Sequence, residues 1–148
     1  MSESVNTAAR ERLEAFVGEW TLEAGPPDGP PWPGGGRVSF EWIEGAPLMI
    51  ERSHVDLPEA PDAVMVIGCD GMTGTYYQLY TDERDVQRIY EMSLDEGVWK
   101  LWRDGEPFSQ RFTGRFSKDG RSIVGRWETA EDGGRWTIDF DLTYTKVA

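Results

Sequence analysis

From residue 19 onward the chain consists of short segments in which apolar and polar residues alternate, separated by turns rich in Gly, Asp or Pro. Alternation with a period of two is typical of β-strands. All nine prolines lie between these segments, as a hydrogen-bonded sheet requires. The pattern predicts ten strands: Glu19–Ala24, Gly36–Ile43, Leu48–His54, Ala63–Cys69, Thr75–Thr81, Val86–Leu94, Val98–Arg103, Phe108–Phe116, Arg121–Thr129 and Arg135–Lys146.

Most connections between these segments are too short for parallel crossovers, so neighbouring strands are expected to pair antiparallel. Closure into a barrel removes the exposed edges of such a sheet. The last segment has one apolar face, which we expect to contain Trp136, Ile138, Phe140, Leu142 and Tyr144. The sequence therefore predicts an all-β fold, an antiparallel up-and-down barrel of about ten strands. An open sandwich is the alternative.

A short helix is predicted before the first strand, at about residues 7–17. Ala9, Leu13 and Phe16 recur at helical spacing and form one apolar stripe. Asn6 or Thr7 is the expected N-cap. A helix of this length is marginal alone, so we expect it to dock over one end of the barrel and to cap it.

Residues 25–35 read GPPDGPPWPGG, a composition that excludes a regular element. We interpret this segment as a flap, with Trp32 packed over the barrel mouth. A role for Trp32 in recognition is the alternative.

Length and charge narrow the class of protein. A chain of 148 residues is expected to form one domain, and its net charge of −12 disfavours nucleic acid and anionic membrane surfaces as partners. No signal peptide is recognised, and the lone Cys69 excludes an internal disulfide. We expect a cytoplasmic protein, as a monomer or a homodimer.

The helix leading into Gly18-Glu19-Trp20 resembles the Gly-x-Trp start of the calycin superfamily, which includes lipocalins and fatty-acid-binding proteins. The ten strands are more similar to the fatty-acid-binding and nitrobindin branches, and the whole chain resembles uncharacterised bacterial lipocalin-like proteins. The resemblance implies that Trp20 lies in the core near the closed end, with a cation of the last strand over its ring. Lys146 occupies that position, where the family usually has Arg.

Few residues suit catalysis or metal binding. The chain has one Cys and one His, and no Gly-rich loop opens a helix as nucleotide-binding loops do. The acidic turns at residues 82–85 and 131–132 lack the spacing of a calcium loop. We therefore expect no catalytic residues, no metal site and no cofactor.

Strand alternation suggests which polar side chains face the barrel interior. Arg52 and His54 share a face with Leu48 and Ile50, and Arg88 and Tyr90 share one with Met92. An inward Arg suits a ligand carboxylate, and fatty-acid-binding proteins use Arg and Tyr in this way. Pairing with carboxylates, or a shift of one residue in facing, is the alternative. The predicted ligand-binding residues are Phe40, Trp42, Arg52, His54, Tyr80, Arg88, Tyr90 and Phe112, with Gln78, Gln110 and Tyr144 as further candidates.

Four functions remain open at this point. The favoured one is a barrel that binds a small hydrophobic molecule with a polar or anionic end. The others are a calycin-type isomerase or cyclase that uses Tyr80, Tyr90 or His54, a haem protein of nitrobindin type, and a barrel filled by its own aromatic side chains. Nitrobindins bind haem through a histidine near the C-terminal end of the chain, and the last segment here contains none. We therefore expect no tight haem binding.

Overall fold

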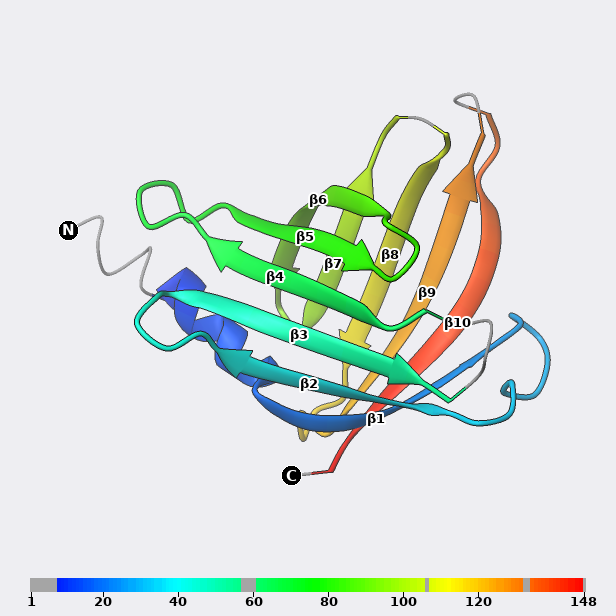
Figure 1. Ribbon diagram of the computed structural model, residues 1–148, viewed down its shortest axis with the longest axis horizontal. Coiled ribbons are helices and arrows are strands. Elements are labelled where there is room, and N and C mark those ends of the chain that lie inside the picture. The colour runs from blue at the N-terminus through cyan, green and yellow to red at the C-terminus, as the bar shows by residue number, and fades with distance from the viewer. Residues whose placement is uncertain (1–7, 57–60, 106, 132–133, 148) are drawn as a thin grey trace.

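Figure 1 shows a computed structural model of the chain, which describes residues 8–56, 61–105, 107–131 and 134–147. One α-helical turn at residues 8–11 continues into a 3-10 helix, η1 (Arg12–Phe16). Ten strands follow: β1 (Gly18–Gly25), β2 (Gly36–Trp42), β3 (Leu48–Val55), β4 (Ala63–Cys69), β5 (Tyr76–Asp82), β6 (Gln87–Asp95), β7 (Val98–Arg103), β8 (Ser109–Phe116), β9 (Ser122–Ala130) and β10 (Thr137–Lys146). The predicted strands are confirmed, and their ends agree to within two residues.

The strands form a closed barrel in which each pairs antiparallel with its neighbours in the sequence, and β1 pairs with β10. The register of this closing pair sets Trp20 opposite Lys146 and Leu22 opposite Tyr144. The predicted up-and-down barrel is therefore confirmed, and the open sandwich is excluded. Among the described residues, no helix has the length and apolar character needed to cross a membrane.

The N-terminal helical segment closes one end of the barrel (Figure 1). Leu13 and Phe16 are fully buried, because the apolar stripe faces into the barrel. Hydrogen bonds attach the segment to the strands: the Tyr76 hydroxyl donates to the backbone carbonyl of Ala9, and Trp42 Nε1 donates to Glu14 at 2.5 Å. The predicted capping helix is confirmed, although its second half is 3-10. The expected N-caps lie outside the described residues.

Aromatic rings fill this closed end. Phe16 lies 4.7 Å from Trp99 and 5.0 Å from Phe40, measured between ring centroids. Trp20 is buried, and its Nε1 donates to the Phe16 carbonyl at 2.8 Å. Lys146 Nζ lies 5.3 Å from the centroid of the Trp20 ring, which confirms the contact that the Gly-x-Trp resemblance implied.

The facing predicted for the start of the last strand is wrong. A bulge between Ile138 and Phe140 shifts the register of β10 against β9, so the residues before it face the opposite side. Ile138 is consequently exposed, and the Trp136 ring lies 4.2 Å from the guanidinium of Arg111, on the outside of the barrel. Phe140, Leu142 and Tyr144 face inward as expected.

Candidate ligand cavity

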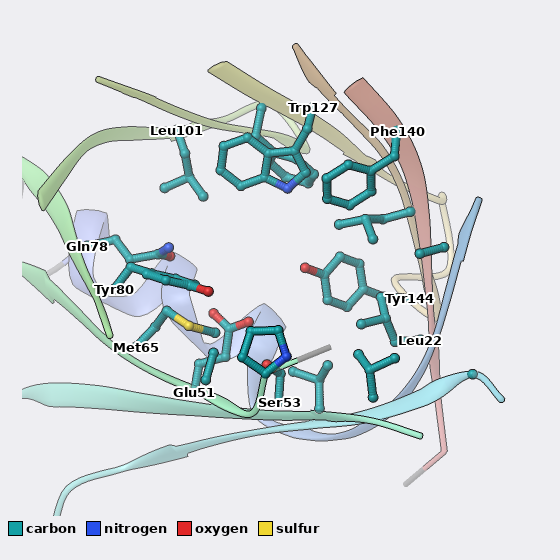
Figure 2. A pocket seen from close by; sticks show the side chains of 18 of the residues that line it. Leu22, Glu51, Ser53, Met65, Gln78, Tyr80, Leu101, Trp127, Phe140 and Tyr144 are labelled. Carbon is teal, nitrogen blue, oxygen red and sulfur yellow. The ribbon is translucent and has the colours of Figure 1, made fainter. Parts of the chain in front are cut away.

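Between the closed end and the opposite mouth, the barrel encloses a cavity of about 680 Å³, partly open to solvent. This volume lies within the range of about 300–1,000 Å³ that small-molecule sites occupy. Figure 2 shows the side chains that point into it, drawn from strands on all sides of the barrel. Its walls are mostly apolar and include Leu22, Val38, Met65, Trp99, Leu101, Phe112, Trp127, Phe140 and Leu142.

The Gly- and Pro-rich loop after β1 borders the mouth of this cavity. Trp32 lines the cavity, remains 44% exposed, and lies 6.0 Å from the Phe140 ring. Its backbone N–H donates to the Ala24 carbonyl at 2.7 Å, which holds this part of the loop against β1. The prediction that Trp32 packs at the barrel mouth is confirmed. Arg84 also lines the cavity, and its guanidinium forms an ion pair with Asp82.

A buried carboxyl group, Glu51 on β3, faces the cavity. The residue is 3% exposed, and within the described part of the chain its Oε1 has no hydrogen-bond partner. Its cross-strand neighbours are Phe40 on β2 and Met65 on β4, so apolar side chains flank it on both sides. Burial disfavours the carboxylate form and raises the pKa of Glu51 to about 8. Near neutral pH, the Glu51 carboxyl group is therefore mostly protonated.

Two further polar side chains line the same cavity. Gln78 is 4% exposed and Trp99 is 1% exposed. Among the described residues, Gln78 Oε1 and Trp99 Nε1 have no hydrogen-bond partner. Tyr144 faces the cavity from β10, and its pKa is raised by burial and by the charge of Glu51. A buried polar group without a partner is costly, and a ligand that supplies the partner recovers this energy.

The prediction that Arg52 and His54 face the interior is wrong. Arg52 pairs with Glu41 at 3.1 Å and His54 Nδ1 lies 2.6 Å from Asp62, with all four side chains more than half exposed. Both residues line a separate hollow of about 540 Å³ on the outer surface. The β3 sequence has apolar residues on both faces, so alternation alone did not choose between them. The hairpin of β2 and β3 pairs Glu51 with Phe40, which faces inward. Counting residues along both strands from the turn between them would therefore have predicted that Glu51 faces the interior.

Arg88 and Tyr90 face inward as predicted, but neither lines the cavity. Gln110 Oε1 accepts hydrogen bonds from Arg88 Nη1 at 3.2 Å and from the Tyr90 hydroxyl at 2.8 Å. The Arg88 guanidinium also lies 5.4 Å from the Phe108 ring. Gln110 thus engages both residues, and Tyr90 supports the cavity wall through its ring contact with Trp127 at 5.7 Å between centroids.

The four remaining predicted residues divide between the two ends of the barrel. Tyr80 and Phe112 line the cavity, whereas Phe40 and Trp42 lie on the inward face of β2 at the closed end. The Tyr80 hydroxyl donates to Asp82 at 2.7 Å. Burial, followed by this bond to a carboxylate, raises the pKa of Tyr80.

Glycine pairing lets the Phe112 ring lie flat against the wall. Gly114 on β8 is paired with Gly125 on β9, and a Cβ atom on Gly125 would lie 2.5 Å from the Phe112 ring.

Nowhere in the described ranges do three or more His, Cys, Asp or Glu side chains form a group suited to a metal ion.

Comparison with known proteins gives a likeness of fold alone. No family model and no curated protein matches the chain. A solved structure of Rv2717c from M. tuberculosis is similar, with a TM-score of 0.62 and 13% sequence identity. The superposition covers 95% of this chain and 98% of that chain. At the level of fold, this likeness and the ten-stranded barrel fit the calycin-like architecture that the sequence suggested.

Proposed function

We propose that this protein binds a small, largely apolar molecule that has a polar end, with the molecule seated in the barrel cavity. One observation carries the proposal: an apolar cavity of about 680 Å³ contains three buried polar side chains, Glu51, Gln78 and Trp99, each with an atom that no described residue pairs. An apolar cavity with a few convergent polar groups is the usual form of a small-molecule site.

The polar end of the ligand is assigned to different residues from those that the sequence suggested. Arg52 lies on the outer face and Arg88 is engaged with Gln110, so neither guanidinium faces the cavity. Glu51, Gln78 and Trp99 take their place. An anionic end is therefore disfavoured, because Arg84 is the one cationic side chain among the described residues that line the cavity, and it is already paired with Asp82.

Two alternatives have less support. The aromatic side chains do not fill the barrel, since the cavity remains beside them. Absence of tight haem binding stays a prediction. The only histidine, His54, points away from the interior and contacts Asp62, an arrangement that offers no histidine ligand inside the barrel.

A neutral fluorescent probe tests the proposal. N-phenyl-1-naphthylamine is uncharged near neutral pH and brightens in apolar surroundings, so it reports on the cavity without an ionic contribution. We expect saturable binding of one probe per chain. Native mass spectrometry of freshly purified protein would reveal a molecule that remains bound through purification.

Two neighbouring substitutions give a matched control. Leu101 points into the cavity (Figure 2), whereas the adjacent Lys100 is exposed on the outside of the same strand. Leu101→Trp should fill part of the cavity and weaken probe binding at least about tenfold, while Lys100→Trp should leave it unchanged. No saturable binding, or equal affinity in the two variants with both folded by circular dichroism, would remove the proposal.

A further inference from the structure

The polar side chains that line the cavity differ in whether they accept or donate hydrogen bonds. Glu51 and Gln78 both line the cavity, and each has a side-chain oxygen, Oε1, without a partner among the described residues; both oxygens are hydrogen-bond acceptors when Glu51 is ionised. Trp99 Nε1 adds one donor. The ligand end that contacts these groups therefore needs hydrogen-bond donors for the oxygens of Glu51 and Gln78. A neighbouring acceptor on the ligand would satisfy the indole N–H of Trp99.

Charge points in the same direction. Arg84 is the one cationic side chain among the described residues that line the cavity, and Asp82 already pairs with it. Glu51 thus has no cation beside it in the described structure, and the protein as a whole carries a net charge of −12. A cation entering the barrel would be attracted over a distance by the protein and, once the Glu51 carboxyl group loses its proton, locally by Glu51.

The aromatic walls suit a positive charge with apolar substituents. Trp99, Phe112, Trp127 and Tyr144 present rings to the cavity from four different strands. Ring faces attract cations, and this attraction strengthens when the cation leaves water. The remaining aliphatic walls favour an apolar tail.

From this arrangement we infer that the cavity selects hydrophobic amines in their protonated form, with the ammonium group bonded to Glu51 and Gln78. The inference rests on the proposed function and specifies its ligand class. Charge-assisted hydrogen bonds are stronger than neutral ones. The hydrogen bonds of the ammonium group should therefore outweigh the cost of its desolvation only where a carboxylate accepts them.

Binding should release a proton. A protonated Glu51 carboxyl meets R–NH₃⁺ and loses its proton to solvent, which leaves a carboxylate–ammonium pair. The groups that face Glu51 allow this proton to be attributed. Phe40 and Met65 on the adjacent strands do not titrate, Tyr144 and Tyr80 both have raised pKa values, and Arg84 is held by Asp82.

Three molecules of one chain length separate the possibilities: octylamine, octanol and octanoate. Titration calorimetry should show octylamine binding about tenfold or more tightly than either of the others. Repeating the octylamine titration at pH 7 in buffers of different ionisation enthalpy should show close to one proton released per amine bound. This second measurement uses the unmodified protein, so it does not depend on any variant folding.

Two isosteric variants separate the cavity from the overall negative charge. Glu51→Gln should weaken octylamine binding about tenfold or more, leave octanol binding within about twofold, and abolish the proton release. Glu91→Gln removes the same charge from the exposed outer face of β6 and should change nothing.

The outcomes distinguish ligand class from function. The amine inference is wrong if octanoate or octanol binds as tightly as octylamine, if no proton is released, or if Glu51→Gln and Glu91→Gln have equal effects. In each of these cases, naphthylamine binding that is lost in Leu101→Trp would still support a site for apolar molecules.

Discussion

The two ends of the barrel are built from the same alternating strands but differ in how their polar groups are treated. At the closed end, Trp20 and Trp42 donate their indole N–H groups to Phe16 and Glu14 of the N-terminal helical segment, and aromatic rings pack at 4.7–5.4 Å around Phe16. In the cavity beyond it, Glu51, Gln78 and Trp99 lie buried with atoms that no described residue pairs.

This difference separates stability from binding. The indole hydrogen bonds of Trp20 and Trp42 and the packed rings at the closed end lower the energy of the folded chain. The cavity lacks such packing and contains buried polar atoms without partners among the described residues. Both features lower the stability of the folded chain, and a bound ligand can offset this loss. Trp99 belongs to both regions, because its ring packs on Phe16 and the residue also lines the cavity. Four predictions test the contrast.

The largest effect concerns Glu51 and pH in the ligand-free protein. Its folded pKa of about 8 exceeds the ordinary 4.5, so the folded state binds the extra proton between these values and the free energy of unfolding falls as pH rises through that window. The slope reaches about 1.4 kcal/mol per pH unit, on the order of 5 kcal/mol in total. Urea unfolding at pH 5, 6.5 and 8 should show this decline in the wild type and its loss in Glu51→Gln. Parallel profiles would mean that Glu51 is not desolvated by the cavity.

The next effect compares a tryptophan at each end. Trp20→Ala should lower the free energy of unfolding by about 3–5 kcal/mol, as expected for a large buried aromatic side chain. Trp32→Ala at the exposed mouth should cost less than about 1 kcal/mol. Urea midpoints of the two variants measure the difference. Equal losses would show that the mouth is packed as firmly as the closed end.

A smaller effect is expected in the cavity wall. Gly125→Ala brings a methyl group against the Phe112 ring and should cost about 1–3 kcal/mol. Val124→Ala, on the exposed outer face one residue away, should change stability by no more than about 0.5 kcal/mol. If Gly125→Ala were as mild as its neighbour, the ring would be free to move into the cavity, and the wall would be less ordered than the closed end.

The smallest effect belongs to the cation over Trp20. Lys146→Met keeps the length of the side chain and removes the charge, so the free energy of unfolding should fall by about 0.5–1 kcal/mol. Lys146→Arg should retain the wild-type value, since a guanidinium also interacts with the indole face. Matched losses in the two variants would assign the effect to packing of the side chain and not to its charge.

Local patterns were sufficient for the elements and for the closed end. Period-two alternation and turn residues placed ten strands, the spacing of Ala9, Leu13 and Phe16 placed the capping segment, and Gly-x-Trp with Lys146 placed one contact across the closing strand pair. Such features are encoded by neighbouring residues or by one strong apolar stripe. The predicted direction of the side chains was correct where the apolar residues of a strand lie mainly on one face, as it was for Tyr90 and Met92 of β6.

The sequence by itself determined ten antiparallel strands and favoured a closed barrel, because alternation, short turns and a capping stripe leave few other ways to bury apolar surface and pair every strand edge. The pairing of β1 with β10 then excluded the open sandwich. The sequence did not determine the cavity chemistry. The facing of β3 was decided by its register with β2 and β4, which placed Glu51 inside and Arg52 outside, and the facing at the start of β10 was decided by a bulge. A shift of one residue exchanges the two faces of a strand, so the polar groups of the cavity depend on long-range pairing that only the tertiary structure supplies.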